Sequence, residues 1–172
     1  MSPPVTAYIA LGSNLGDREA NLRRAVDRLG ASSGVRVVAV STFYDNLAIG
    51  GPPESPPFLN AAAVVETTLS AHHLLRRLLA VERGMGRVRR QKWEPRVIDL
   101  DLLLYDMDIV DAPGLTVPHP LMHQRDFVLR PLAEIAHAAI HPVLGRTVGD
   151  LLMLIESRQA EVMPKIRGFP IH

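Results

Sequence analysis

Apolar and polar residues recur along this chain with two periods, which predict strands alternating with helices. The run Val5–Leu11 is apolar and partly β-branched, so it predicts a buried strand. Residues 17–29 place apolar side chains at helical spacing with charges between them, which predicts an amphipathic helix. The same patterns predict strands over 35–44, 58–67 and 97–105, a hairpin partner for the last strand at 108–110, and helices over 71–83, 124–136 and 148–157.

The order of the predicted elements indicates the fold class. Strand, helix, strand, strand, helix, strand is the split β-α-β-β-α-β arrangement of a ferredoxin-like α+β fold, an antiparallel sheet with helices packed on both faces. A break is expected in the helix over 124–136 at Pro131. The segment Asp45–Pro57 holds Gly50, Gly51 and four prolines, so it predicts a long loop, and long loops in compact domains are often functional.

Composition narrows the class of protein. The chain has 172 residues, which fits one domain over residues 1–172, and its net charge of +1 gives no overall attraction to nucleic acid or membrane. There are 0 cysteines, which excludes disulfides and cysteine zinc sites. Neither a signal peptide nor a membrane-spanning run is evident. The expectation is a cytoplasmic monomer that acts on small molecules, without nucleic-acid or membrane partners.

Two aspartates form the most informative pattern. Side chains alternate across a strand, so Asp99 and Asp101 point to one face while the leucines at 100, 102 and 104 point to the other. Two carboxylates about 7 Å apart at Cα are within reach of shared cations, and magnesium prefers carboxylate and phosphate oxygens. Taken by itself, the Asp-x-Asp pair is better explained as part of a solvated strand face.

A basic segment precedes the aspartates. Residues 87–96 hold five cations and Trp93, the only tryptophan, and they lead directly into the strand that carries Asp99. Arginine matches phosphate oxygens with two parallel hydrogen bonds, and an aromatic ring in a polar loop needs a flat partner to pack on. The combination favours a metal–polyphosphate site over a solvated basic loop.

Three other places carry candidate residues, each with a structural alternative. Phe58 and Asn60 share one strand face and suit a planar heterocycle, although alone they are better explained as a core residue and a turn cap. His119 lies between two prolines and suits a phosphate or a plain turn. Arg125 and Phe127 have a shared role only where the helix start is irregular or extended.

These segments together resemble one family, the 6-hydroxymethyl-7,8-dihydropterin pyrophosphokinases of folate biosynthesis. The matching strings run in the family's order over most of the chain. They are Gly12-Ser13-Asn14-Leu15-Gly16, Phe58-Leu59-Asn60-Ala61, Gly86-Arg87-Val88-Arg89, Trp93-Glu94-Pro95-Arg96-Val97-Ile98-Asp99-Leu100-Asp101, Thr116-Val117-Pro118-His119-Pro120 and Arg125-Asp126-Phe127-Val128-Leu129. The chain departs from the family's pattern at 45–50, where a Thr-x-Pro type run is usual.

The resemblance implies an ATP-dependent diphosphotransferase that gives AMP and the pterin diphosphate, with two Mg²⁺ ions held by Asp99 and Asp101. It also implies the remaining roles. Catalytic residues would be Arg87, Arg96, Asp99 and Asp101. ATP would contact Glu82, Arg87, Arg89, Arg96, Leu102, Thr116 and His119. The pterin would contact Asn46, Ile49, Phe58, Asn60, Trp93, Arg125 and Phe127.

Three alternatives remain open from the residues. A ferredoxin-like RNA-binding module would use Trp93 and the phenylalanines as stacking platforms, but paired aspartates would repel a phosphate backbone. A metal-dependent phosphodiesterase would hydrolyse its substrate without an acceptor. A catalytically silent relative would only bind a pterin or a nucleotide.

Overall fold

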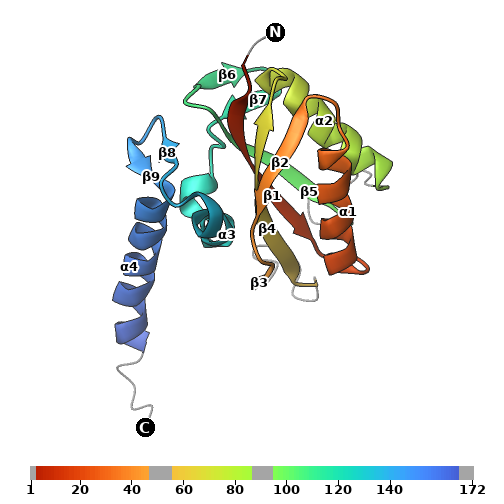
Figure 1. Cartoon of the computed structure of the whole chain (residues 1–172). Helices are drawn as coiled ribbons and strands as arrows, with labels where there is room; N and C mark the ends of the chain where they lie inside the picture. Colours follow the sequence, from red (N-terminus) through yellow and green to blue (C-terminus); the bar gives the residue numbers. More distant parts are fainter. Residues whose placement is uncertain (1–2, 47–55, 87–94, 167–172) are drawn as a thin grey trace.

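A computed structural model describes residues 3–46, 56–86 and 95–166, of which 162–166 are described by backbone only. Figure 1 shows a sheet flanked by helices, with the C-terminal helix standing apart from it. The elements in chain order are β1 (Val5–Ser13), α1 (Arg18–Gly30), β2 (Val35–Val40), β3 (Tyr44–Asn46), β4 (Phe58–Thr67), α2 (Ala71–Gly84), β5 (Asp99–Tyr105), β6 (Val110–Ala112), β7 (Leu115–Val117), the 3₁₀ helix η1 (Met122–Gln124), α3 (Asp126–Ala136), β8 (Ile140–His141), β9 (Arg146–Thr147) and α4 (Val148–Ile166).

The main sheet confirms the predicted fold class. Its strands lie in the order β2-β4-β1-β5, all described pairings are antiparallel, and β3 extends the sheet by pairing with β4. With the four long strands numbered along the chain, this is the ferredoxin-like order, in which the first strand is central. Strand β5, which carries the two aspartates, forms an edge.

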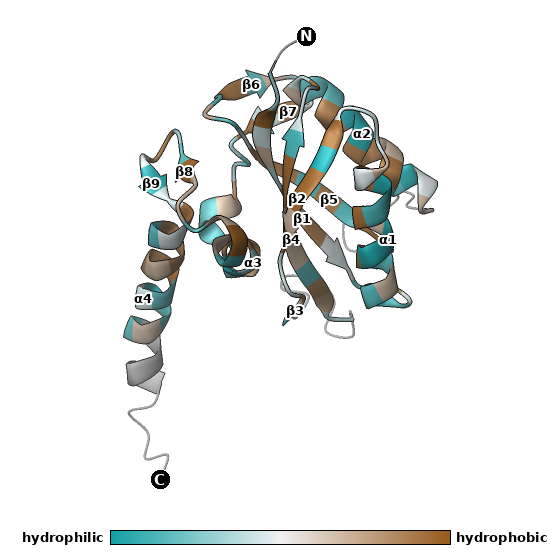
Figure 2. Cartoon of the chain, in the orientation of Figure 1, coloured by the Kyte–Doolittle hydropathy of each residue, from teal (hydrophilic) through white to brown (hydrophobic). Residues whose placement is uncertain are grey.

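Two hydrophobic clusters fill the two faces of the sheet. One packs Leu22 of α1 and Leu78 of α2 against strand residues that include Ile9 and Leu100. The other packs Leu129 of α3 against the opposite face, and residues of α4 join this cluster by packing on α3. Figure 2 shows apolar residues concentrated along the strands and polar residues along the outer sides of α1 and α2. Helices therefore cover both faces, as predicted.

The helices begin where the sequence supplies a cap. The Asp17 carboxylate accepts a hydrogen bond from the Ala20 N–H at the start of α1, and the Ser70 hydroxyl accepts one from the His73 N–H at the start of α2. Each cap satisfies a backbone donor that has no partner within the helix. Helix α3 differs, because Arg125 precedes it in an extended conformation without a side-chain cap.

Several local predictions were wrong. Helix α3 runs through Pro131 without a break, since a proline removes one internal hydrogen bond while its buried ring adds to the packing. Strand β6 pairs with β7, so 108–110 is no hairpin partner of β5. The first two residues of the predicted loop 45–57, Asp45 and Asn46, belong to strand β3. The prediction for residues 47–55 lies outside the described part of the chain.

Alternation along β5 holds for most of the strand and fails near its end. Leu100 and Leu102 join the α1/α2 cluster as predicted, but Leu103 and Leu104 both join the α3 cluster. The cause is a register shift against β1 between Tyr8 and Ile9, which leaves two consecutive residues of β5 on the same side. The prediction for Leu104 was therefore wrong, whereas the aspartates lie before the irregularity.

Candidate active site

The candidate site lies on the α3 face of the sheet, where β1, β4 and β5 run side by side. Asp101 pairs with Ala10, which packs against the α3 cluster, and Asp99 pairs with Gly12. Leu100 between them points to the other face, so both aspartates share the α3 face, as the alternation predicted.

Gly12 lets neighbouring side chains approach the backbone closely at the centre of this face. It pairs with Asp99 of β5 on one side and with Asn60 of β4 on the other. A Cβ atom built at Gly12 would lie 3.0 Å from Asn60 Nδ2 and 3.4 Å from Phe58 Cδ1. Phe58 and Asn60 therefore lean over the glycine from the same face, opposite Asp99. The predicted pair of an aromatic and an amide on one face is confirmed.

Asn60 carries a hydrogen-bonding atom without a protein partner. Its Oδ1 is buried and accepts no hydrogen bond from the described residues, whereas buried polar atoms in folded proteins are nearly always bonded. A planar ligand with an N–H on its edge would satisfy this oxygen. This is an observation about the site itself, independent of sequence resemblance.

Asn14 fixes the turn after β1 to the start of β5. The Arg96 N–H donates to Asn14 Oδ1 at 2.7 Å, and the Asn14 N–H donates to the Arg96 carbonyl at 3.0 Å. The Asn14 amide also donates to the Pro56 carbonyl at 3.3 Å. The sequence analysis included Asn14 in a string that matches the family but assigned it no role. The only local signal was an amide, which both donates and accepts, directly after a Gly-Ser pair.

Arg96 then places a cation beside the aspartates. Its guanidinium lies 3.1 Å from Asp99 Oδ2, and both side chains are about three-quarters buried, with 25% and 21% exposed. A charge pair that is partly shielded from water interacts more strongly than one on the surface. An anion bound at this place would contact Arg96 directly and the two aspartates through a bound cation.

His119 and Arg125 approach the same place from the segment before α3. The His119 N–H donates to the Leu103 carbonyl of β5, and its Nδ1 accepts from the Leu121 N–H at 3.2 Å. Burial lowers the pKa of His119, the positive charge of Arg125 lowers it further, and Asp99 opposes both. The ring is therefore neutral near pH 7, with its proton on Nε2.

The start of α3 brings Arg125 and Phe127 together. Arg125 has φ −118° and ψ 105°, the extended start that the sequence required, and its guanidinium carbon lies 5.7 Å from the centre of the Phe127 ring. This cation–π contact orients both side chains. Asp126 between them accepts a hydrogen bond from Gln159 of α4 at 3.3 Å, so α4 helps to hold this end of α3.

The other predicted site residues fall into three groups. Asn46 is in β3, beside Phe58, and Thr116 is exposed in β7. Two buried residues lie away from the α3 face: Leu102 in the α1/α2 core, and Glu82 of α2, whose carboxylate accepts a hydrogen bond from the Leu100 N–H at 2.7 Å. The predictions for four residues lie outside the described part of the chain: Ile49, Arg87, Arg89 and Trp93.

Comparison with known proteins agrees with this geometry. A model of the 7,8-dihydro-6-hydroxymethylpterin-pyrophosphokinase family matches residues 8–137. Two proteins named 2-amino-4-hydroxy-6-hydroxymethyldihydropteridine pyrophosphokinase are each 43% identical. The one from Methylorubrum extorquens aligns over 87% of this chain and 93% of its own length, and the one from Haemophilus influenzae over 80% and 86%.

Solved structures support the fold. A Plasmodium falciparum HPPK-DHPS with pteroate has a TM-score of 0.72 at 15% identity and covers 92% of this chain. The chain spans only 43% of the length of that solved structure.

The fold and the matches to known proteins together define the class of protein: a kinase-type transferase with a ferredoxin-like α+β fold. More narrowly, the chain belongs to the 7,8-dihydro-6-hydroxymethylpterin-pyrophosphokinase family, whose members are diphosphotransferases. Across the described residues, no helix is both long enough and apolar enough to cross a membrane.

Proposed function

We propose that this enzyme transfers the pyrophosphoryl group of ATP to the hydroxymethyl group of 6-hydroxymethyl-7,8-dihydropterin, with magnesium, in folate biosynthesis. One observation carries the proposal. Gly12 separates a paired-carboxylate strand end from an aromatic–amide pair on the same sheet face, so a phosphate-binding half and a ring-binding half adjoin. The names of the relatives supply the substrate class.

The chemistry of the donor set fits magnesium. Asp99 and Asp101 project from alternate positions of β5 on this face, and within the described ranges no cluster of three or more His, Cys, Asp or Glu side chains is suited to a metal. Magnesium is commonly held by one or two carboxylates plus substrate phosphates and water. When bound there, two ions would neutralise triphosphate charge and polarise the phosphorus that is attacked.

The cationic side chains are proposed to hold the triphosphate. Arg96 is already oriented by Asp99, and a neutral His119 donates one hydrogen bond from Nε2 to a phosphate oxygen. Arg87 and Arg89 are proposed to contribute by family resemblance. Fixed donors of this kind stabilise the charge that develops on the leaving AMP oxygen.

The ring-binding half is proposed to take the pterin. Asn60 Oδ1 would accept from an N–H on the pterin edge, which gives the orphaned oxygen its missing bond. Phe58 and Phe127 would stack on the two ring faces. Asn46, beside Phe58, would line the edge, and Ile49, Trp93 and Arg125 complete the proposed set.

The proposed reaction requires little covalent work from the protein. The hydroxymethyl oxygen forms a bond to the β-phosphorus, the bond from that phosphorus to the α–β bridging oxygen breaks, AMP leaves, and the hydroxyl proton passes to solvent. The side chains align the attacking oxygen with the leaving oxygen, and alignment is a large part of the rate enhancement.

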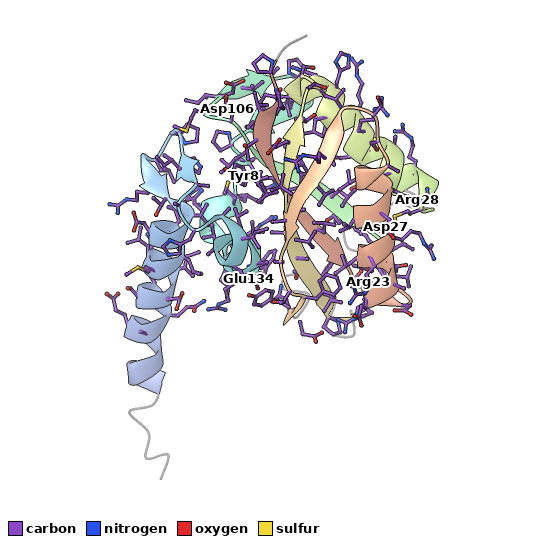
Figure 3. All side chains as sticks on the ribbon, viewed as in Figure 1. Tyr8, Arg23, Asp27, Arg28, Asp106 and Glu134 are labelled. Carbon is purple, nitrogen blue, oxygen red and sulfur yellow. The ribbon has the colours of Figure 1, made fainter. Side chains whose placement is uncertain are left out.

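A product assay tests the proposal. Protein is incubated with ATP, magnesium and reduced hydroxymethylpterin, and AMP, ADP and phosphate are quantified with and without the pterin. Pterin-dependent AMP without ADP is expected. Asp101→Asn should abolish it, and Asp27→Asn, an exposed aspartate on α1 (Figure 3), should leave it unchanged. Pterin-independent phosphate release would instead indicate a hydrolase, and full activity of Asp101→Asn would refute the metal role.

A further inference from the structure

A carboxylate on α3 joins two parts of the chain that lie far apart in sequence. Glu134 Oε1 accepts hydrogen bonds from the Thr42 hydroxyl and the Tyr44 hydroxyl, both at 2.6 Å, and Glu134 Oε2 accepts one from the Thr42 N–H at 2.9 Å. Three donors on one carboxylate make a specific tether, and its exposure to water reduces the strength of each bond. Figure 3 shows Glu134 between α3 and the β3 end of the sheet.

The tethered segment borders the ring-binding half of the site. Tyr44 pairs with Asn60 and Asn46 pairs with Phe58, so each lies directly beside a residue proposed to contact the pterin. Residues directly opposite in an antiparallel pair project to the same face. Strand β3 has three residues and, among the described strands, pairs with β4 alone, so its own backbone bonds fix it weakly.

The opposite end of α3 carries Phe127, the second aromatic residue proposed to stack on the pterin. Phe127 and Glu134 are seven residues apart on α3, and that spacing places them on one side of the helix about 10 Å apart along its axis. Glu134 binds β3 at one end of the helix while Phe127 presents its ring at the other. Glu134 is thus one of the contacts that set the distance between Phe127 and the Phe58–Asn60 strand end, together with the packing of α3 on β4 and the Asp126–Gln159 hydrogen bond.

We propose that Glu134 is a positioning residue that helps to set the distance between Phe58 and Phe127, the two rings of the proposed pterin slot, by tethering α3 to Thr42 and Tyr44. The inference rests on the proposed function and adds a residue that does not touch substrate. Loss of the tether makes the positions of both Phe127 and the β3 segment beside Phe58 less fixed. The phosphate-binding half, held by Asn14, Arg96 and Asp99 through other contacts, stays in place.

Steady-state kinetics with AMP as product test the tether in the full chain. In Glu134→Ala the KM for the pterin should rise about tenfold, which matches the loss of roughly 1.4 kcal/mol. The KM for ATP should change less than about twofold, since its contacts are elsewhere. Glu134→Gln, which keeps the acceptor oxygen, and Tyr44→Phe, which removes one donor, should each raise the pterin KM by about threefold. Glu156→Ala, an exposed glutamate of α4, is the matched control and should behave as wild type.

A second readout is independent of turnover. Hydrogen exchange of the Thr42 amide should accelerate in Glu134→Ala, because its acceptor is removed. An unchanged pterin KM with accelerated exchange would overturn the inference, as would an equal rise in both KM values. If wild type gives no pterin-dependent AMP, the proposed function fails first and the inference falls with it. Wild-type activity with unaffected variants would refute the inference alone.

Discussion

Replacing Gly12 by alanine tests the close approach of Asn60 and Phe58 to the centre of the site. The added Cβ would lie 3.0 Å from Asn60 Nδ2, whereas ordinary contact begins at 3.4 Å, so the amide must retreat by about 0.4 Å. Misplacement by about 1 Å costs on the order of a hundredfold in kcat/KM, so about 0.4 Å should cost roughly five- to tenfold. The loss should appear in the KM for the pterin and not in that for ATP.

Stability and a matched control separate this steric effect from a general loss of structure. Gly12 lies in an ordinary region of φ, so alanine adds no backbone strain and lowers the entropy of the unfolded chain, which offsets part of the contact penalty. The thermal midpoint should therefore change little. Gly30→Ala, whose Cβ would meet only Val37 at 3.7 Å, should leave both KM values unchanged. A wild-type pterin KM in Gly12→Ala would refute the assigned slot.

Three further predictions concern the metal site, the histidine and the buried glutamate. Asp101→Ala should abolish AMP formation yet keep the wild-type circular dichroism spectrum, since the side chain contributes to binding rather than to the core; full activity would contradict this. The folded-state pKa of His119 is lowered, so the unfolded chain takes up the proton first and stability should decline as pH falls below about 6.5. A His119→Gln variant should show a shallower decline in thermal midpoint, and equal slopes would exclude this histidine. Glu82→Met should lower the free energy of unfolding in urea by about 1–3 kcal/mol, because it leaves the Leu100 N–H without its acceptor.

Predictions from the sequence were correct where the alternation of side chains along a single strand decides the structure. Alternation placed Asp99 and Asp101 on one face, and the predicted strand 58–67 coincides with β4. It failed at Leu104, because the irregularity that changes the phase of β5 arises from its partner strand, opposite Tyr8 and Ile9. A register shift between two strands leaves no mark in the sequence of either one.

Long-range contacts account for the parts of the site that the sequence could not show. Glu134 and Tyr44 are 90 residues apart, and neither stands in a motif. Asn14 meets Arg96 across 82 residues, although a short polar turn gave a partial signal. Local patterns predict which face a side chain takes, whereas the contact partner depends on how distant elements pack.

The position of β5 at the sheet edge has a consequence for solubility. An edge strand offers unpaired backbone donors to any neighbouring chain, and proteins protect such edges with charged groups. The Leu100 N–H donates to the Glu82 carboxylate, so this donor cannot pair with a strand of another chain. The same carboxylate contact thus reduces the exposed hydrogen-bonding capacity of the strand that presents the two aspartates. In sedimentation at high concentration, Glu82→Met should self-associate more than wild type, and equal behaviour of the two proteins would show that other features protect the edge.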